Sequence, residues 1–421
     1  MPASATLLDE LSWRGLLYQQ TDGLAAHLAA GRLTAYCGFD PTAPSLHIGN
    51  LVPAMLLVHL ARAGHRAIAL VGGGTAMIGD PSGKSEERPL SGVEEIDANA
   101  ARIHAQLERL FASAGTTGVE LRNNAQWLRD TRMLEFMRHV GKHFSINYML
   151  AKDSVQSRLE NGISYTEFSY MLLQAYDFLE LHQREGVTLQ VGGTDQWGNI
   201  TAGMELVRRA AGAEAHGLTA PLLMTSRGKK FGKTESGAVW LDASLTSPYS
   251  FYQFWVNTED AVVGRCLRMF TFRSQAEIAD LEAAHTAAPH QRGAQTALAH
   301  DVTTMLHGAD AARVARDVSR VIFDKKIDVH AIDDDVYETL AAEIPGARYA
   351  GAVELDVLGV LEQAFALSRG AGRKLLQQGG VTVNGEKPGT GELTVARDRA
   401  VRGRWFLVRK GGRDIALADV G

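Results

Sequence analysis

The chain has 421 residues, a length that favours two or three domains with full hydrophobic cores. Its apolar share of 45% and charged share of 22% are typical of a globular protein, and no apolar run approaches the 18 residues of a membrane-spanning helix. The net charge of −5 by itself indicates no nucleic-acid partner, and two cysteines exclude a disulfide framework or a cysteine-based zinc site. We therefore expect a cytoplasmic protein without a membrane partner or a bound transition metal.

Apolar strands and helices alternate in the first half of the chain. Strands are predicted at residues 33–39, 67–71 and 188–193, a helix is predicted at 51–63, and glycines follow two of the strands, at 72–74 and 192–193. Continuous apolar strands separated by helices predict an α/β fold with a Rossmann-like, doubly wound parallel sheet. The ligand of such a sheet lies at the carboxyl ends of its strands.

The pattern changes in the second half. Residues 246–332 are mostly helical, and residues 333–352, which are acidic and then contain proline and glycine, predict a linker. Residues 353–421 predict a small α+β domain with a hairpin turn at Asn384-Gly385 and a strand at 405–408. Between Arg369 and Arg413 there are eleven Lys or Arg and three Asp or Glu, so that segment carries +8 and the remainder −13. A basic appendage on an acidic body is typical of RNA binding.

Two short stretches about 180 residues apart are together suited to phosphates. His47-Ile48-Gly49-Asn50 offers an imidazole, an amide and a glycine against which a flat ring can lie. Lys230-Phe231-Gly232-Lys233-Thr234 offers two cations on flexible stems. Residues 79–85 do not form a Walker loop, because three residues separate their glycines where four are needed. The sequence therefore predicts that these two motifs hold a nucleotide from two sides without a Walker loop.

Five motifs in order resemble those of class I aminoacyl-tRNA synthetases, and of the bacterial tyrosyl-tRNA synthetase family in particular. They are Tyr36 to Thr42 with His47 to Asn50, Gly79 to Lys84, Tyr170 to Phe178, Gly192 to Asn199, and Lys230 to Thr234. The resemblance covers about residues 16–408. It implies a catalytic domain at 1–245 with an insertion at about 121–164, an α-helical anticodon-arm-binding domain at 246–332, a linker at 333–352, and a small ribosomal-protein-like RNA-binding domain at 353–421.

The resemblance implies a two-step reaction with ATP and Mg²⁺ and without a tightly bound cofactor. The carboxylate of L-tyrosine attacks the α-phosphate of ATP, giving tyrosyl-adenylate and pyrophosphate. The tyrosyl group then passes to the 3′-terminal adenosine of tRNA(Tyr). Such chemistry needs positioning and charge stabilisation more than an enzyme nucleophile. The family also implies a homodimer, for which the insertion at about 121–164 is a candidate interface.

The same resemblance implies an amino-acid site in which Tyr36 and Asp177 hold the phenol. The full set implied for the amino acid is Tyr36, Asp80, Tyr170, Gln174, Asp177 and Gln196. Asp80, Tyr170 and Gln174 are the members implied for the α-ammonium group. Independently of the family, Tyr170, Gln174 and Asp177 fall at i, i+4 and i+7 and so share one helix face. The structural alternative is that Tyr170 and Gln174 only pack and solvate that helix.

The implied nucleotide residues surround the adenosine and the phosphates. The ATP-binding set is Cys37, Gly38, Asp40, His47, Gly49, Gly193, Asp195 and Lys233. The catalytic set at the phosphates is Thr42, His47, Asn50, Lys84, Arg88, Lys230, Lys233 and Thr234. Cys37 as an ordinary buried thiol, and Lys84 and Arg88 as solvated surface, stay open as alternatives. Asn50 replaces the second histidine of the commonest signature, yet it can still donate a hydrogen bond to a ribose oxygen.

In the basic segment, Arg369, Arg373 and Lys374 are the predicted RNA-binding residues, because a helix would present them along one phosphate-tracking edge. A solvated basic surface is the alternative. For the whole chain we weigh three other functions: a tryptophan--tRNA ligase of the same fold, a small-molecule nucleotidylyltransferase, and a non-catalytic RNA-binding relative of the synthetases. Tyr36 with Asp177 favours tyrosine, because buried groups that expect a hydroxyl are left unpaired by a ligand without one.

Overall fold

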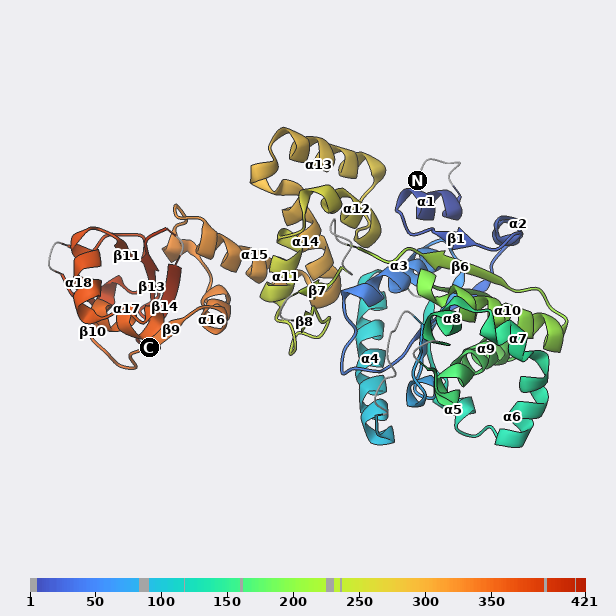
Figure 1. The fold of residues 1–421 in the computed structure, drawn as a ribbon. Coiled ribbons are helices and arrows are strands. Elements are labelled where there is room, and N and C mark those ends of the chain that lie inside the picture. Colours follow the sequence, from blue (N-terminus) through green and yellow to red (C-terminus); the bar gives the residue numbers. More distant parts are fainter. Residues whose placement is uncertain are drawn as a thin grey trace. The chain divides into compact units, whose positions relative to one another are not determined.

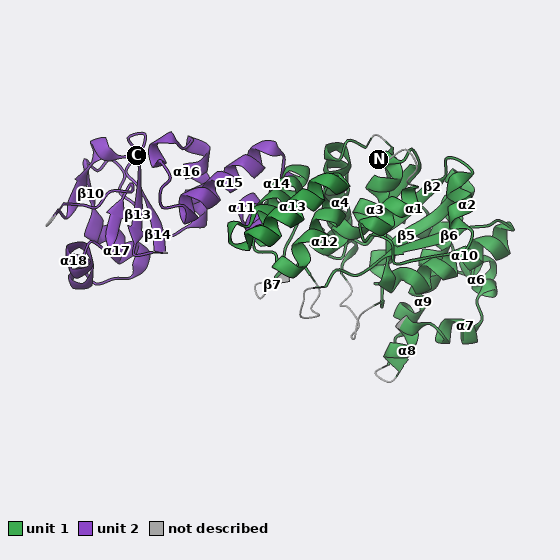
Figure 2. Cartoon of the chain, turned by 90° about the horizontal axis from the view of Figure 1, so that it is seen from above, with its two compact units in different colours: residues 1–247, 254–306 green, residues 248–253, 307–421 purple. Residues whose placement is uncertain are grey.

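The structure is a computed structural model that describes residues 6–82, 91–116, 118–159, 162–224, 231–234, 237–389, 392–412 and 414–421, with Ser154, Lys233 and Thr234 described by their backbone alone. The chain forms two compact units (Figure 2). The first unit comprises Met1–Ser247 and Phe254–Leu306, and the second comprises Pro248–Gln253 and His307–Gly421. The predicted domain boundaries at 245 and 352 lie inside these units and stay predictions of where functional domains divide.

The first unit is built on a six-stranded sheet with the strand order β1-β6-β5-β2-β3-β4 (Figure 1). The strands are β1 (Gln19–Gln20), β2 (Thr34–Phe39), β3 (Arg66–Val71), β4 (Val119–Asn123), β5 (Val187–Gly193) and β6 (His216–Ala220). Only the short β1 is antiparallel to its neighbour. From β2 the chain winds towards β4, and from β5 it winds the other way, so the predicted doubly wound sheet reverses between β2 and β5.

Helices cover both faces of this sheet. The first-unit helices are α1 (Leu7–Trp13), α2 (Leu24–Ala29), α3 (Ile48–Arg62), α4 (Val93–Ser113), α5 (Ala125–Leu128), α6 (Met133–His139), α7 (Ile146–Leu150), α8 (Asp153–Leu159), α9 (Tyr165–Glu185), α10 (Trp197–Ala211), α12 (Asp260–Phe270) and α13 (Gln275–Ala287), with most of α14 (Gly293–His307). α3 and α4 lie on one face, and α9 and α10 on the other (Figure 1). This is the arrangement that right-handed crossovers produce when winding reverses.

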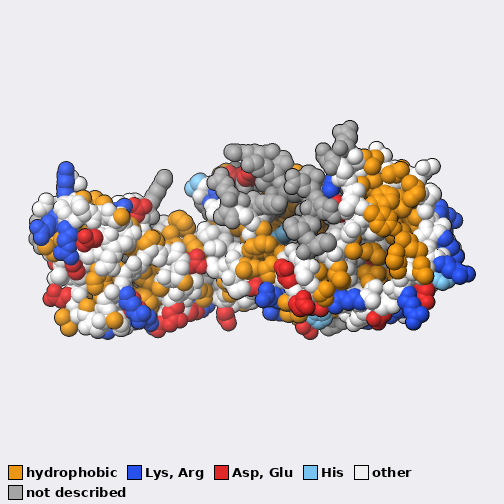
Figure 3. Space-filling model, turned by 60° about the horizontal axis from the view of Figure 1, so that its bottom comes forward, with side chains coloured by type: hydrophobic (Ala, Val, Ile, Leu, Met, Phe, Trp, Pro, Cys, Tyr) orange, Lys and Arg blue, Asp and Glu red, His pale blue; other side chains and the backbone are white. Residues whose placement is uncertain are grey.

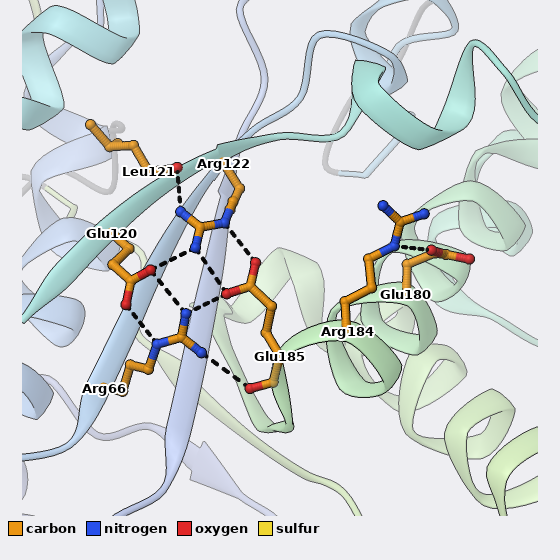
Figure 4. Close-up of polar contacts among 7 residues, drawn as sticks. All are labelled: Arg66, Glu120, Leu121, Arg122, Glu180, Arg184 and Glu185. Carbon is orange, nitrogen blue, oxygen red and sulfur yellow. Dashed lines mark hydrogen bonds and ion pairs between the residues drawn. The ribbon is translucent and has the colours of Figure 1, made fainter.

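Helix α9 is the element that carries three predicted amino-acid residues, and both of its ends are fixed. Ser164 caps its start by accepting a hydrogen bond from the Glu167 backbone N–H, and Gly186 ends it with φ +67°. At its C-terminal end Glu185 lies in a cluster of two carboxylates and two guanidinium groups with Arg66, Glu120 and Arg122 (Figure 4). This charge cluster ties α9 to β3 and to the edge strand β4.

The second unit contains a four-stranded sheet in the order β11-β13-β14-β9 and a two-stranded sheet of β10 and β12. Its strands are β9 (Gly346–Arg348), β10 (Glu354–Asp356), β11 (Val381–Val383), β12 (Thr394–Ala396), β13 (Trp405–Lys410) and β14 (Asp414–Asp419). Its helices are α15 (Ala309–Phe323), α16 (Asp334–Glu343), α17 (Val357–Phe365) and α18 (Arg369–Gln377), and α11 (Pro248–Val256) begins in this unit. Asn384 and Gly385 both have positive φ, at 51° and 85°, as the predicted hairpin turn requires.

The stretch 333–352, predicted as a linker, is largely structured. It holds α16 and β9, and β9 pairs in parallel with β14. Val336, Tyr337 and Leu340 of α16 are buried in a cluster that also contains Trp405. The acidic residues that suggested a linker lie on the solvent side of an amphipathic helix. This helix is short and has few apolar positions, so its helical periodicity does not stand out in the sequence.

Candidate active site

A cavity of about 340 Å³ lies at the carboxyl ends of β2 and β5, where the winding of the sheet reverses. Its wall unites predicted site residues from four of the five motifs. These are Tyr36, Cys37, Gly38, Asp40, Thr42, His47, Gly49, Asn50, Asp80, Tyr170, Gln174, Asp177, Gly193, Asp195 and Gln196. Residues far apart in the sequence therefore share one cavity of a size suited to small ligands.

Tyr36 on β2 and Asp177 on α9 form a buried part of this cavity and are 1% and 2% exposed. The Tyr36 hydroxyl has no hydrogen-bond partner among the described residues. Asp177 accepts hydrogen bonds from Asn124 Nδ2 at 2.9 Å and from Trp127 Nε1 at 2.7 Å. Burial raises the pKa of Asp177 to about 8, and the two hydrogen bonds oppose that shift. A ligand hydroxyl would satisfy both groups, because it can accept from Tyr36 and donate to Asp177.

Asp40 follows β2 and is joined to α9. Its two carboxylate oxygens accept hydrogen bonds from Thr75 Oγ1 and from Tyr170 Oη, each at 2.7 Å. Burial first, and then Asp40, raise the pKa of Tyr170 well above its ordinary value, so this phenol stays protonated. Its oxygen keeps lone pairs for a ligand ammonium group while its proton goes to Asp40. The predicted nucleotide residue Asp40 and the predicted amino-acid residue Tyr170 are thus in direct contact.

Asp80 is the third carboxylate of the cavity. It accepts hydrogen bonds from Gln196 Nε2 at 2.6 Å and from the Ser82 backbone N–H at 2.9 Å, and Asn199 Nδ2 lies at 3.5 Å. Gln174, half-buried on α9, lines the same cavity. All of these donors are neutral, so a cationic group of a ligand would be attracted to this part of the wall.

The start of α3 forms another part of the wall. Asn50 Oδ1 accepts a hydrogen bond from the His47 backbone N–H at 3.0 Å, so the amide oxygen caps the helix while the amide nitrogen stays a donor. Because the amide nitrogen of Asn50 can still donate, asparagine can take the place of the histidine of the commonest signature. A Cβ at Gly49 would lie 2.8 Å from His47 Cε1, so a side chain there would displace the imidazole. Backbone N–H groups of a helix start favour an anion here.

The second half of the predicted phosphate motif packs against the first. Gly232 has φ +85°, and a Cβ there would lie 3.1 Å from Ile48 Cβ. The Ile48 N–H donates to the Val239 carbonyl at 3.2 Å, and His47 forms a β-bridge with Trp240. Lys84, Arg88 and Lys230 lie outside the described residues. Lys233 and Thr234 are described only as the backbone strand β7 (Lys233–Thr234), which pairs with β8 (Gly237–Ala238).

The ends of β2 and β5 bring Cys37, Gly38, Gly193 and Asp195 together. Burial raises the pKa of the Cys37 thiol, which therefore stays protonated and a weak donor. A Cβ at Gly193 would lie 2.6 Å from Asp195 Oδ1, whereas a Cβ at Gly38 would meet no atom within 4 Å. Gly38 therefore leaves room above β2 for a flat ring, and Thr42 and Asp195 are exposed at the cavity.

Among the polar residues that sequence reasoning missed, Thr75, Asn124 and Gln190 line this cavity, and Trp127 donates a hydrogen bond to Asp177. Thr75 and Asn124 directly follow the glycine run after β3 and the end of β4, so their positions at strand ends were the available signal. Gln190 lies opposite Tyr36 across β2 and β5, is 2% exposed, and its Oε1 has no partner among the described residues. A lone polar residue within an apolar strand was the signal for Gln190.

The predicted RNA-binding residues lie on α18 in the second unit, where Figure 3 shows Lys and Arg side chains gathered at one end of that unit. Arg373 and Lys374 are exposed. Arg369 pairs with Asp356 at 2.7 Å and with Glu362 at 3.4 Å, so its charge is partly neutralised within the unit. Arg373 and Lys374 are therefore the stronger candidates for contacts with phosphates.

Across the described ranges, no helix is long and apolar enough to cross a membrane. In that same part of the chain, no group of three or more His, Cys, Asp or Glu side chains is arranged to hold a metal ion.

Comparisons with known proteins agree on one family. The family described as tRNA synthetases class I (W and Y) matches residues 28–324. A tyrosine--tRNA ligase of Anaeromyxobacter dehalogenans (strain 2CP-1 / ATCC BAA-258) is 52% identical over 418 residues, which are 98% of this chain and 99% of that protein. One of Bacillus caldotenax is 49% identical over 416 residues, with the same coverage. A C-terminally truncated mitochondrial tyrosyl-tRNA synthetase of Aspergillus nidulans has a TM-score of 0.70 and 34% identity, covering 76% of this chain and 95% of that one.

Proposed function

The chain belongs to the class I tRNA synthetases (W and Y), and from this premise we propose that it joins L-tyrosine to tRNA(Tyr) in two steps. In the first step the carboxylate of tyrosine attacks the α-phosphate of ATP, and tyrosyl-adenylate and pyrophosphate form. In the second step a ribose hydroxyl of the terminal adenosine of the tRNA attacks the tyrosyl carbonyl, and AMP leaves. Mg²⁺ arrives with the phosphates of ATP, since oxygen ligands of this kind suit that ion.

The observation that carries the assignment to tyrosine is the pair of Tyr36 and Asp177. One side chain holds a buried hydroxyl without a described partner, and the other holds a buried carboxylate between two neutral donors. Tyrosine fills this arrangement with its phenol, which accepts from Tyr36 and donates to Asp177. Phenylalanine would leave both groups unpaired. The indole of tryptophan has only an N–H donor, at a different position from the phenol oxygen, and it has no acceptor for Tyr36.

The rest of the cavity orders the two substrates for attack. Asp80, Tyr170 and Gln174, with Gln196, hold the α-ammonium group, and the neutral donors around Asp80 leave its negative charge for that cation. Gly38, Gly193 and Asp195 receive the adenosine, for which Gly38 leaves space. His47, Thr42 and the start of α3 face the phosphates, where donors that stabilise charge in the transition state act without a nucleophile of the enzyme.

ATP–pyrophosphate exchange tests this assignment directly. The unchanged protein should exchange with tyrosine and fail with phenylalanine and tryptophan. Tyr36→Phe should raise the KM for tyrosine about tenfold, the effect of one hydrogen bond, and should leave the KM for ATP unchanged. Exchange with tryptophan and none with tyrosine would refute the assignment to tyrosine.

The second unit supplies the tRNA contacts in this proposal, through Arg373 and Lys374 on α18. Cutting the chain at about residue 352 would be a poor test, because it would remove β14, the partner of β9. The double variant Arg373→Glu with Lys374→Glu in the full chain should leave pyrophosphate exchange unchanged and weaken charging of tRNA(Tyr), more so at low salt, where contacts with phosphates contribute most.

A second copy of the chain is the proposed partner of the insertion. Met133, Leu134 and Ile146 are large apolar residues that are 73%, 81% and 61% exposed, and Figure 3 shows hydrophobic side chains gathered on part of the first unit. Exposed apolar surface of this kind marks interfaces. Sedimentation of Leu134→Asp should shift a dimer towards the monomer, whereas Leu245→Asp, at another exposed leucine, should not. We place the enzyme in the cytoplasm, with its tRNA.

A further inference from the structure

Four hydrogen bonds join five side chains around the cavity in series, and the backbone of α9 closes this series into what we call the ring: Asp177, Asn124, Thr75, Asp40 and Tyr170. Asn124 Nδ2 donates to Asp177 Oδ2 at 2.9 Å and to Thr75 Oγ1 at 3.0 Å. Thr75 Oγ1 and Tyr170 Oη donate to the two oxygens of Asp40, each at 2.7 Å. Because Tyr170 and Asp177 both lie on α9, the ring begins and ends on one helix.

The direction of every hydrogen bond in this ring is fixed by chemistry. A hydroxyl has one proton, so Thr75, which accepts from Asn124, gives that proton to Asp40. Asn124 uses both protons of its amide nitrogen on Asp177 and Thr75, and its Oδ1 accepts from the Gly74 backbone N–H at 2.7 Å. Thr75 and Asn124 are 2% and 1% exposed. Their donors are therefore spent inside the ring and are not available to a ligand.

The glycine run after β3 makes room for the ring. A Cβ at Gly72 would lie 1.8 Å from Asp40 Oδ1 and 2.5 Å from Thr75 Oγ1. A Cβ at Gly74 would lie 2.8 Å from Leu128 Cδ1 and 3.2 Å from Asn124 Oδ1. Any side chain at Gly72 would thus displace the hydrogen bond between Thr75 and Asp40. In the sequence the glycine run only marks the end of a strand, whereas in the structure it leaves space for the ring.

We propose that Thr75 and Asn124 are positioning residues that fix the Asp40 and Asp177 carboxylates in one arrangement, so that the nucleotide and amino-acid subsites are set together. The inference rests on the proposed function, in which Asp177 meets the phenol and Asp40 borders the adenosine. The ends of β2, β3 and β4 each contribute one member, Asp40, Thr75 and Asn124, so a shift at one subsite is transmitted through buried hydrogen bonds to the other.

The KM values for tyrosine and ATP in pyrophosphate exchange test the ring in the full-length protein. Asn124→Ala should raise both values about tenfold, although Asn124 does not contact Asp40. Thr75→Val, which keeps the shape and removes the hydroxyl, should raise the KM for ATP about tenfold, and Thr75→Ser should restore it. In the Thr75→Val background, Asn124→Ala should raise only the KM for tyrosine, because the connection to Asp40 is already broken.

Trp127→Phe is the matched control, because Trp127 donates to the same Asp177 carboxylate from outside the ring. It should raise the KM for tyrosine and leave the KM for ATP unchanged. Thermal melting of each variant identifies any that is unfolded, and the nearly isosteric Thr75→Val keeps the test valid if Asn124→Ala does not fold. An unchanged KM for ATP in Thr75→Val, or equal effects of Thr75→Val and Thr75→Ser, would overturn the ring's role. Absence of tyrosine-dependent exchange in the unchanged protein would instead overturn the proposed function, and the ring's role with it.

Discussion

The two ends of the region formed by β3, β4 and α9 hold carboxylates in opposite ways. At the carboxyl ends of the strands, Asp177 is buried between two neutral donors, and no described cation pairs with it. At the C-terminal end of α9, Glu185 and Glu120 lie between Arg66 and Arg122, with three of the contacts at 2.6 Å (Figure 4). The same three elements thus carry one buried carboxyl group left for a ligand and one charge cluster that is complete in itself.

The contrast separates activity from stability. A buried carboxylate without a cation lowers the free energy of unfolding, and it is retained where a ligand completes it. A cluster in which each carboxylate meets two guanidinium groups needs no ligand and fixes the helix on which the site depends. We therefore expect the removal of Asp177 to lower activity, and the removal of the Glu185 charge to lower stability.

Asp177→Ala should have the largest effect. It removes the acceptor for the phenol, and the kcat/KM for tyrosine in pyrophosphate exchange should fall by at least about 100-fold, the range for a lost hydrogen bond to a charged group. The free energy of unfolding, measured with urea at neutral pH, should not fall, because removal of a buried acid with a raised pKa offsets the loss of two hydrogen bonds. An Asp177→Ala variant that unfolds readily and keeps its kcat/KM would reverse the contrast.

Glu185→Gln should show the opposite pattern. It leaves Arg66 and Arg122 with Glu120 alone, and the free energy of unfolding should fall by about 2 kcal/mol, as for partly buried charged hydrogen bonds. The KM for tyrosine at 25 °C should change less than twofold, since Tyr170 and Asp177 lie two or more turns away on α9. A large rise in that KM with unchanged stability would mean that the cluster sets the geometry of the site.

More of the site residues than of the residues that hold them in place could be predicted from the sequence. The strand ends and the helix face of Tyr170, Gln174 and Asp177 follow from local periodicity, and the motifs supplied their roles. The ring and the cluster around Glu185 join residues that are distant in the chain, and Thr75, Asn124 and Glu185 lie in no motif. Pairings of this kind depend on strand order, which periodicity does not determine. The structured segment at 333–352 was missed for a related reason, because β9 exists only through its pairing with β14.

The pH dependence of stability should have opposite signs at the two ends. Burial raises the pKa of Asp177 to about 8 from 3.8, so the folded state holds a proton that the unfolded state releases, and stability falls as pH rises from about 4 to about 8. Hydrogen bonding to Arg66 lowers the pKa of Glu120 to about 2 from 4.5, so its contribution is present above about 4.5 and is lost as pH falls through about 2. Urea unfolding from pH 3 to 9 should show the decrease in stability assigned to Asp177, with a slope of at most about 1.4 kcal/mol per pH unit. This decrease should be absent in Asp177→Ala and present in Glu120→Gln.

The smallest effect is expected at Arg184, next to the cluster. Arg184 pairs with Glu180 at 2.6 Å (Figure 4), which is its one ion pair among the described residues. It is 54% exposed and lies over the ring of Trp127. Arg184→Met keeps an unbranched stem to pack on that ring and removes only the ion pair, so the free energy of unfolding should change by less than about 0.5 kcal/mol, as for isolated surface pairs. Glu185→Gln, one residue further along α9, should have several times that effect, because its carboxylate is held by two guanidinium groups at once. Equal effects in a urea titration would mean that the cluster stabilises the chain no more than a single exposed pair, and that β3 and β4 hold α9 by apolar packing instead.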